Sequence, residues 1–162
     1  MSGAALALAF ARSVGFAARA PGFGHPSVPS GVRVVVGAAL AFAVAPGVTA
    51  PPSARDGAGL IAGLLFEALI GAAIGAFASL LYDGAYAGGR VVDDYAGVRA
   101  IAPSVTMVAP SGFGRIWSLA FTSGFFLLGG YRIVVLAFAR SFALFPPGAV
   151  PSTHAMLKYA VA

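Results

Sequence analysis

The longest apolar stretch of the chain, residues 60–82, contains a single charged side chain, Glu67. A stretch of this length is typical of a membrane-crossing helix, which needs roughly 20 apolar residues. A carboxylate placed in lipid is unfavourable by several kcal/mol, so such a group usually faces protein or water. We therefore expect a long helix whose acid is buried against something other than lipid.

Composition favours a membrane protein over a soluble enzyme or a nucleic-acid-binding protein. The 162 residues are 59% hydrophobic and 9% charged, whereas soluble domains carry about a quarter charged residues. The 10 basic residues are scattered singly, unlike the clusters of a nucleic-acid-binding surface. The chain has no cysteine, which excludes disulfides and cysteine metal ligands.

Proline and glycine divide the sequence into helices and loops. Pro103 and Pro110 disfavour helix in the segment 99–112, and Gly129 with Gly130 predicts either a bend or a tight packing point in the last long apolar segment. The N-terminal segment lacks the basic start of a secretory signal, so we expect it to form a first helix. The expected helices are 2–19, 32–45, 58–97 and 113–145, with another starting near 154, and the expected loops are 21–30, 46–57 and 99–112.

The predicted helices are either short or interrupted by charge. The segment 32–45 would be about 21 Å long, less than the hydrocarbon core of about 30 Å. The other helices carry Arg12, Glu67, or Arg132 with Arg140, inside apolar sequence. Such residues usually contact protein or water. The sequence thus predicts an all-α, membrane-associated bundle of about four to five apolar helices that pack on one another within an assembly.

Glu67 shares one helical face with two glycines. Gly71 and Gly75 follow it at four-residue intervals and form a small-xxx-small pair that allows another backbone to approach closely. One interpretation makes Glu67 a structural group, bonded to Arg12 or Arg33 of a neighbouring helix. The other makes it a proton carrier or a pore-lining group.

Neither the polar end of the segment 58–97 nor the two histidines form a pattern typical of a catalytic or metal site. Arg90 precedes Asp93 and Asp94 by three and four residues, so an intrahelical ion pair is feasible. We expect a solvated helix end here, because the oxygen ligands that a metal would need do not follow. His25 and His154 have no convincing nucleophile near them in the sequence. We therefore predict no catalytic, cofactor or metal site.

Taken in order, these features resemble one family of membrane proteins, the FliR/SpaR/YscT (SctT) subunits of the type III secretion export apparatus of flagella and injectisomes. The resemblance rests on Arg12, the loop APGFGHPSVPSGVR with Pro21, Pro29 and Arg33, Pro46, FEALIGAAIGAF with Glu67 and Gly71, AGGRVVDDYAG with Gly88 and Gly97, and LGGYR followed by SFALFPPG. It covers essentially the whole chain, and the forms GGY and VVDDYAG are closer to the injectisome branch. Family members continue beyond the PPG element, so we expect a C-terminally truncated member.

The resemblance implies a single export-gate helical domain, 1–162, in the bacterial inner membrane within the secretion basal body. Its partners would be the P-type, Q-type, S-type and U-type export subunits, and unfolded secreted proteins would pass through the shared pore. The chain would have neither enzymatic activity nor a cofactor. Contacts between helices or subunits are expected at Arg12, Arg33, Glu67, Gly71, Gly75, Gly88, Arg90, Asp93, Gly129 and Gly130.

The resemblance also implies a gate in the segment 99–112, because the corresponding family segment enters the pore. Ile101, Val105, Met107 and Val108 would supply an apolar seal that excludes water, and a flexible methionine could yield to a passing chain. The alternative is a plain loop between helices, with these side chains used in packing.

Two other functions stay open. A small proton-coupled transporter would use Glu67 as its intramembrane acid. A membrane-embedded enzyme would use His25 or the pair Asp93 and Asp94.

Overall fold

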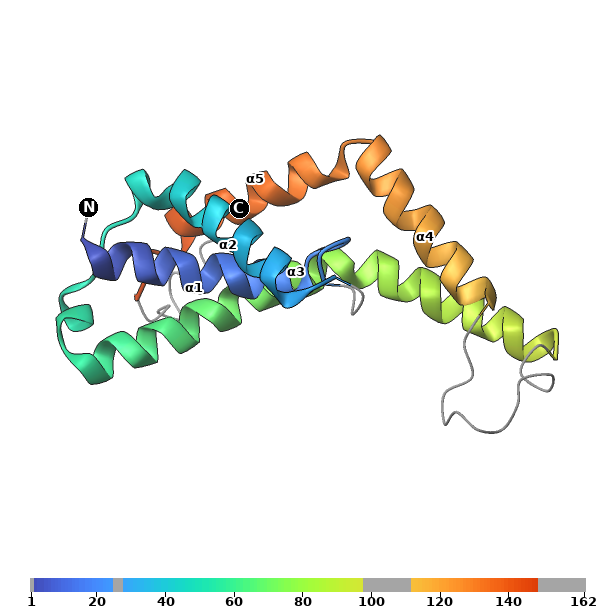
Figure 1. Cartoon of the computed structure of the whole chain (residues 1–162), viewed down its shortest axis with the longest axis horizontal. Helices are drawn as coiled ribbons and strands as arrows, with labels where there is room; N and C mark the ends of the chain where they lie inside the picture. Colours follow the sequence, from blue (N-terminus) through green and yellow to red (C-terminus); the bar gives the residue numbers. More distant parts are fainter. Residues whose placement is uncertain (1, 25–27, 98–111, 149–162) are drawn as a thin grey trace.

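A computed structural model describes residues 2–24, 28–97 and 112–148, and within these ranges every regular element is helical (Figure 1). The elements are α1 (Gly3–Arg19), α2 (Ser30–Val44), η1 (Ala45–Gly47), η2 (Pro52–Arg55), α3 (Gly57–Tyr95), α4 (Gly112–Leu127) and α5 (Gly130–Leu144). The prediction of an all-α chain of four to five apolar helices is confirmed for the described residues.

Helix α1 lies between α2 and α3 and carries much of the buried core (Figure 1). It begins after Ser2, whose side-chain oxygen accepts a hydrogen bond from the amide of Ala5 at 3.3 Å and so caps the first turn. Leu8 and Phe16 are among its buried side chains. The N-terminal segment therefore forms the predicted first helix, and the structure shows that this helix belongs to the core of the bundle.

Helix α2 is longer than the sequence indicated. It begins two residues before the predicted start and continues into the 3₁₀ turn η1, so that Ser30–Gly47 forms a continuous segment of 18 residues. The stretch expected as a loop, 46–57, contains η2 as well. Proline is tolerated in the first turn of a helix, where its missing N–H has no partner to lose, so Pro46 and Pro52 do not prevent these turns.

Helix α3 is the longest element, with 39 residues, and at 1.5 Å per residue it extends about 58 Å. Its first half runs beside α1 in the same direction, and its second half carries α4 (Figure 1). The polypeptide then bends at Gly129, which has the left-handed φ of 75°, and α4 and α5 meet at 73°. Through this bend, α5 returns to the end of the molecule where α1 lies (Figure 1). The predicted bend at the glycine pair is confirmed.

Much of the apolar surface of these helices faces outwards. By length and composition, Ser30–Gly47 and Gly57–Tyr95 are each able to cross a membrane, and α4 with α5 would add a third crossing if the bent pair forms one span. In the apolar windows of the first two segments, 17% of the residues are buried within the described chain. The described chain therefore leaves most of its membrane-compatible surface for lipid or for other proteins.

Candidate functional site

Arg12 of α1 and Glu67 of α3 form an ion pair in the interior of the bundle. The Nε of Arg12 donates to Oε2 of Glu67, and both side chains are fully buried. The parallel packing of α1 on α3 brings the two residues to the same level of the molecule. The sequence left Arg12 and Arg33 as alternative partners, and the structure places Arg12 at the carboxylate.

The rest of the Arg12 guanidinium binds the end of α5. Nη1 donates to the carbonyl oxygen of Ser141 at 3.0 Å and to its hydroxyl oxygen at 3.2 Å, while Nη2 donates to the carbonyl oxygen of Phe145 at 2.8 Å. The carbonyl oxygen of Ser141 also accepts the amide of Phe145 at 2.8 Å, and a cation at the C-terminal end of a helix interacts favourably with the helix dipole. Arg12 therefore fixes the last turn of α5 against α1.

The second oxygen of Glu67 binds the turn that follows α5. Its Oε1 accepts a hydrogen bond from the amide of Gly148 at 3.0 Å. Gly148 has φ of 72°, and a Cβ at this position would overlap the ring of Pro51. Both the backbone conformation and the close contact require glycine here. Glu67 thus uses both carboxylate oxygens, one for α1 and one for the turn after α5.

Aromatic side chains enclose the ion pair. The Cζ of Arg12 lies 4.2 Å from the centroid of the Phe142 ring, a cation–π distance. The rings of Phe138 and Phe16 stack with centroids 4.6 Å apart, and Phe142 meets Phe138 edge to face. Because both charged side chains are fully buried, the attraction between them is screened less than it would be at a surface.

Glycines allow the two helices to come close enough for this pair to form. A Cβ on Gly71 would overlap the carbonyl oxygen of Arg12, and one on Gly75 would lie 2.5 Å from the carbonyl oxygen of Phe16. Gly15 of α1 approaches the backbone of Ala68 in the same way. The glycine face expected from the sequence is therefore the surface on which α1 packs.

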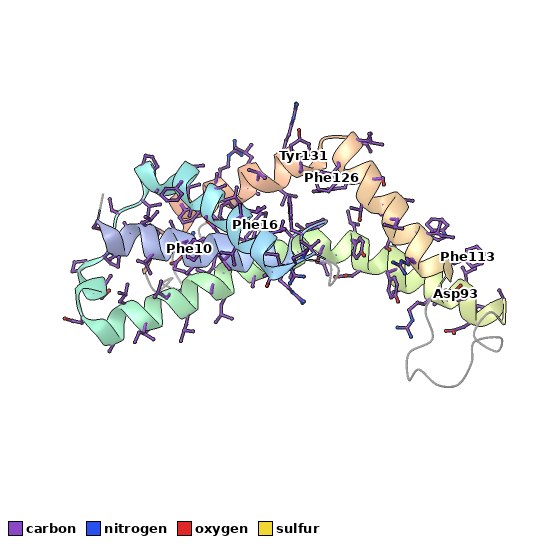
Figure 2. All side chains as sticks on the ribbon, in the orientation of Figure 1. Phe10, Phe16, Asp93, Phe113, Phe126 and Tyr131 are labelled. Carbon is purple, nitrogen blue, oxygen red and sulfur yellow. The ribbon has the colours of Figure 1, made fainter. Side chains whose placement is uncertain are left out.

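A second buried carboxylate, Asp93, holds the start of α4. Its Oδ1 accepts from the amide of Phe113 at 3.0 Å and its Oδ2 lies 3.5 Å from the amide of Gly114, so it acts as the N-terminal cap of that helix. Asp93 and Phe113 lie together at the end of the α3–α4 pair (Figure 2). A Cβ on Gly89 would also overlap Gly114. The expectation of a solvated helix end is wrong for Asp93, which is 1% exposed, because α4 covers it.

The remaining predicted contact residues are spread over the molecule. Arg33 is half-buried near the start of α2, and Arg90 is half-buried on α3. Gly88 is exposed, and a Cβ there would meet nothing within 4 Å among the described residues. Gly129 forms the bend, and a Cβ on Gly130 would lie 2.6 Å from the ring of Phe125.

Two groups of predicted residues lie outside the described ranges. They are the proposed gate residues Ile101, Val105, Met107 and Val108, and the histidines His25 and His154. Within the described ranges, there is no group of three or more His, Asp or Glu residues placed to hold a metal ion.

Sequence reasoning missed several groups that complete the two polar centres. Ser141, Phe145 and Gly148 bind the Arg12–Glu67 pair, chiefly through backbone atoms, which leave no mark on side-chain patterns. The glycine that follows two prolines in FPPG was the available signal for a tight turn at Gly148. Gly114 is the buried contact of α4 with α3, and it was not singled out as a contact from the sequence.

Comparison with known proteins places this architecture in a family. No curated protein matches the chain. The family model described as bacterial export proteins, family 1, matches residues 4–162, which include every described helix apart from the first residue of α1. The Arg12–Glu67 pair, the Asp93 cap and the bend at Gly129 all lie within the match. The chain therefore belongs to the bacterial export proteins, family 1, a family of membrane components with a role in protein export.

Proposed function

We propose that this chain is a non-enzymatic subunit of the type III secretion export gate, which lines and helps to close the pore for unfolded proteins. Membership of the export family supports a role in protein export alongside other components of the apparatus. We propose the role in lining and closing the pore in addition. We also propose the P-type, Q-type, S-type and U-type partners and the location in the bacterial inner membrane.

The observation that carries the proposal is the complete engagement of Glu67. Its two oxygens bind Arg12 and the amide of Gly148, and it is fully buried. An acid that carries protons across a membrane needs access to water or to exchangeable partners. The bonding of Glu67 is instead that of a group that holds α1, α3 and the turn after α5 together, which favours a structural role over the transporter alternative.

The outward surface of the long helix supports packing against other subunits. Helix α3 extends about 58 Å, whereas the hydrocarbon core of a bilayer is about 30 Å thick. Large apolar side chains are exposed along it, including Leu69 (68%) and Phe77 (74%), and Leu128 at the bend is 89% exposed. A helix that is longer than a bilayer is thick cannot be covered by lipid along its whole length, so we expect neighbouring subunits to cover part of it.

The gate is the part of the proposal that rests on the family resemblance. The residues that flank the segment 98–111 are held together, because Asp93 caps α4 at Phe113 and Gly89 contacts Gly114. We propose that four apolar side chains form a seal that excludes water by dewetting and so closes the pore. They are Ile101, Val105, Met107 and Val108. Because the flanking ends of α3 and α4 are fixed to each other, they would keep such a seal in position.

The test is co-purification of the tagged chain with P-type and Q-type subunits expressed beside it. We expect a complex of defined stoichiometry, and a chain that aggregates when it is expressed without these partners. The control is expression beside an unrelated polytopic membrane protein, which should not co-purify. A stable chain that binds neither subunit and transports protons by itself in vesicles would overturn the proposal in favour of the transporter.

A further inference from the structure

A cavity lined by both charged and apolar side chains lies where the loop after α1, the middle of α3 and the first two-thirds of α4 meet. Its volume is about 530 Å³. The described residues that line it include Arg19 from the end of α1, Tyr82 and Asp83 from α3, and Arg115 and Thr122 from α4. It is separate from the Arg12–Glu67 pair, none of whose residues line it.

The cavity carries more positive than negative charge. Arg19 and Arg115 both line it, and neither has a carboxylate within ion-pairing distance among the described residues. Asp83 is the one acidic residue among the described lining residues, and it already accepts a hydrogen bond from the hydroxyl of Ser79 at 3.2 Å. Two like charges at one cavity repel each other, and an anion bound between them relieves that repulsion.

The serine and threonine hydroxyls of the lining already have acceptors, which leaves the two arginines and the hydroxyl of Tyr82 as donors. Thr122 donates to the carbonyl oxygen of Ser118 at 2.9 Å, and Ser118 donates to that of Arg115 at 3.0 Å. Ser79 likewise has partners for its proton in Ala76 and Asp83. Guanidinium groups match the paired oxygens of a phosphate, so an acceptor-only anion of this kind fits the donors that remain.

The position of the cavity along α3 indicates where the anion comes from. The apolar stretch 60–82, broken only by the internally paired Glu67, is 23 residues or about 35 Å long, close to the hydrocarbon thickness. It ends at Tyr82, and tyrosine and arginine are typical of the membrane boundary. Leu119 lines the cavity and is 58% exposed, so it offers an apolar surface beside the charges.

We propose that this cavity binds the phosphate of an anionic phospholipid headgroup through Arg19 and Arg115. The headgroup would lie against the two arginines of the cavity, while the acyl chains would lie on apolar side chains such as Leu119. The site orients the chain at the membrane boundary, and it does not depend on the export-gate assignment, since it uses neither Glu67 nor the segment 98–111.

The test is native mass spectrometry of the full chain, purified in mild detergent with any export subunits that accompany it. Phosphatidylglycerol or phosphatidylcholine is titrated in, and retained lipid is counted. We expect preferential retention of phosphatidylglycerol and a loss of about tenfold in its apparent affinity for each of Arg19→Gln and Arg115→Gln. The matched control is Arg140→Gln, which removes an exposed arginine of α5 outside the cavity and should leave retention unchanged.

Other outcomes decide against the proposal in distinct ways. Equal retention by the wild type and the two cavity variants, or an equal loss in Arg140→Gln, overturns it. Competition by inorganic phosphate that depends on both arginines, without retention of phosphatidylglycerol, overturns the lipid source and leaves a free-anion site. Loss of export subunits from the cavity variants, with lipid retention unchanged, shows instead that a protein partner occupies the cavity.

Discussion

The guanidinium of Arg12 and the carboxylate of Glu67 form a buried ion pair that connects the first and third helices and also holds the end of α5. Such a pair is not strongly stabilising by itself, because removing two charges from water offsets most of their attraction. The pair favours one packing of the three helices over others, because a shift of α1, α3 or α5 would leave a buried charge without its partner. We therefore interpret the pair as the element that specifies how these helices fit together.

The close contact of α1 and α3 predicts opposite effects for one substitution at two glycines of α3. Gly71→Ala should lower the yield of folded protein and its thermal midpoint, because a Cβ there would overlap the backbone of Arg12. Gly88→Ala should be neutral or stabilising by about 0.5–1 kcal/mol, because its Cβ meets no described atom and alanine favours helix. Thermal unfolding in detergent measures both, and equal midpoints for the two variants would contradict the packing described.

The cap on α4 predicts a local effect at two amides. Asp93→Ala should lower the free energy of unfolding by about 0.5–2 kcal/mol. It should also raise hydrogen exchange at Phe113 and Gly114, whose amides donate hydrogen bonds to the carboxylate. Asp93→Asn keeps a side-chain carbonyl and should retain most of the protection. Exchange measured by mass spectrometry checks this, and unchanged protection in the alanine variant would show that Asp93 is not the cap.

The bend between α4 and α5 predicts a strain effect. Gly129 has φ of 75°, so Gly129→Ala should destabilise the chain by about 1 kcal/mol. Gly124→Ala provides the matched control within α4, because a Cβ there meets no described atom and should favour the helix. Thermal unfolding of both variants is the measurement. A more stable Gly129→Ala variant would mean that the chain does not require the left-handed conformation at this position.

The gate proposal predicts a leak in the closed state. Deleting 101–108, or replacing Met107 and Val108 by serine, should raise the ion conductance of membranes that contain the assembled complex, because the apolar seal would be lost. Replacing the exposed Leu128 of the bend by serine should leave the conductance unchanged. Conductance is compared in planar bilayers at equal amounts of complex. A deletion that leaks no more than the wild type removes the gate assignment.

The helices could be predicted from the sequence because proline, glycine and apolar runs act locally. The boundaries of α1, α3 and the bend at Gly129 follow from such patterns, and the glycine face of Glu67 follows from helical periodicity. The extension of α2 into η1 was missed, because proline at the start of a turn was interpreted as a stop.

The connections between helices could not be predicted, because they depend on tertiary packing. The sequence offered Arg12 and Arg33 equally as partners of Glu67, and the parallel packing of α1 on α3 selects the first. Asp93 looked like part of a solvated end, because nothing in the local sequence shows that α4 folds back over it. The backbone groups of Ser141, Phe145 and Gly148 have no side-chain pattern that could reveal their role.

The central claim, that the charges inside these apolar helices hold the fold together for assembly, is tested most directly by the yield of complex with P-type and Q-type subunits after Glu67→Gln. We expect the yield to fall sharply, because a buried Arg12 without a carboxylate costs about 3–5 kcal/mol, and to recover in part in the double variant Arg12→Met with Glu67→Leu, where no unpaired charge is left. A normal yield of complex from Glu67→Gln together with abolished secretion would contradict the claim and assign Glu67 to conduction.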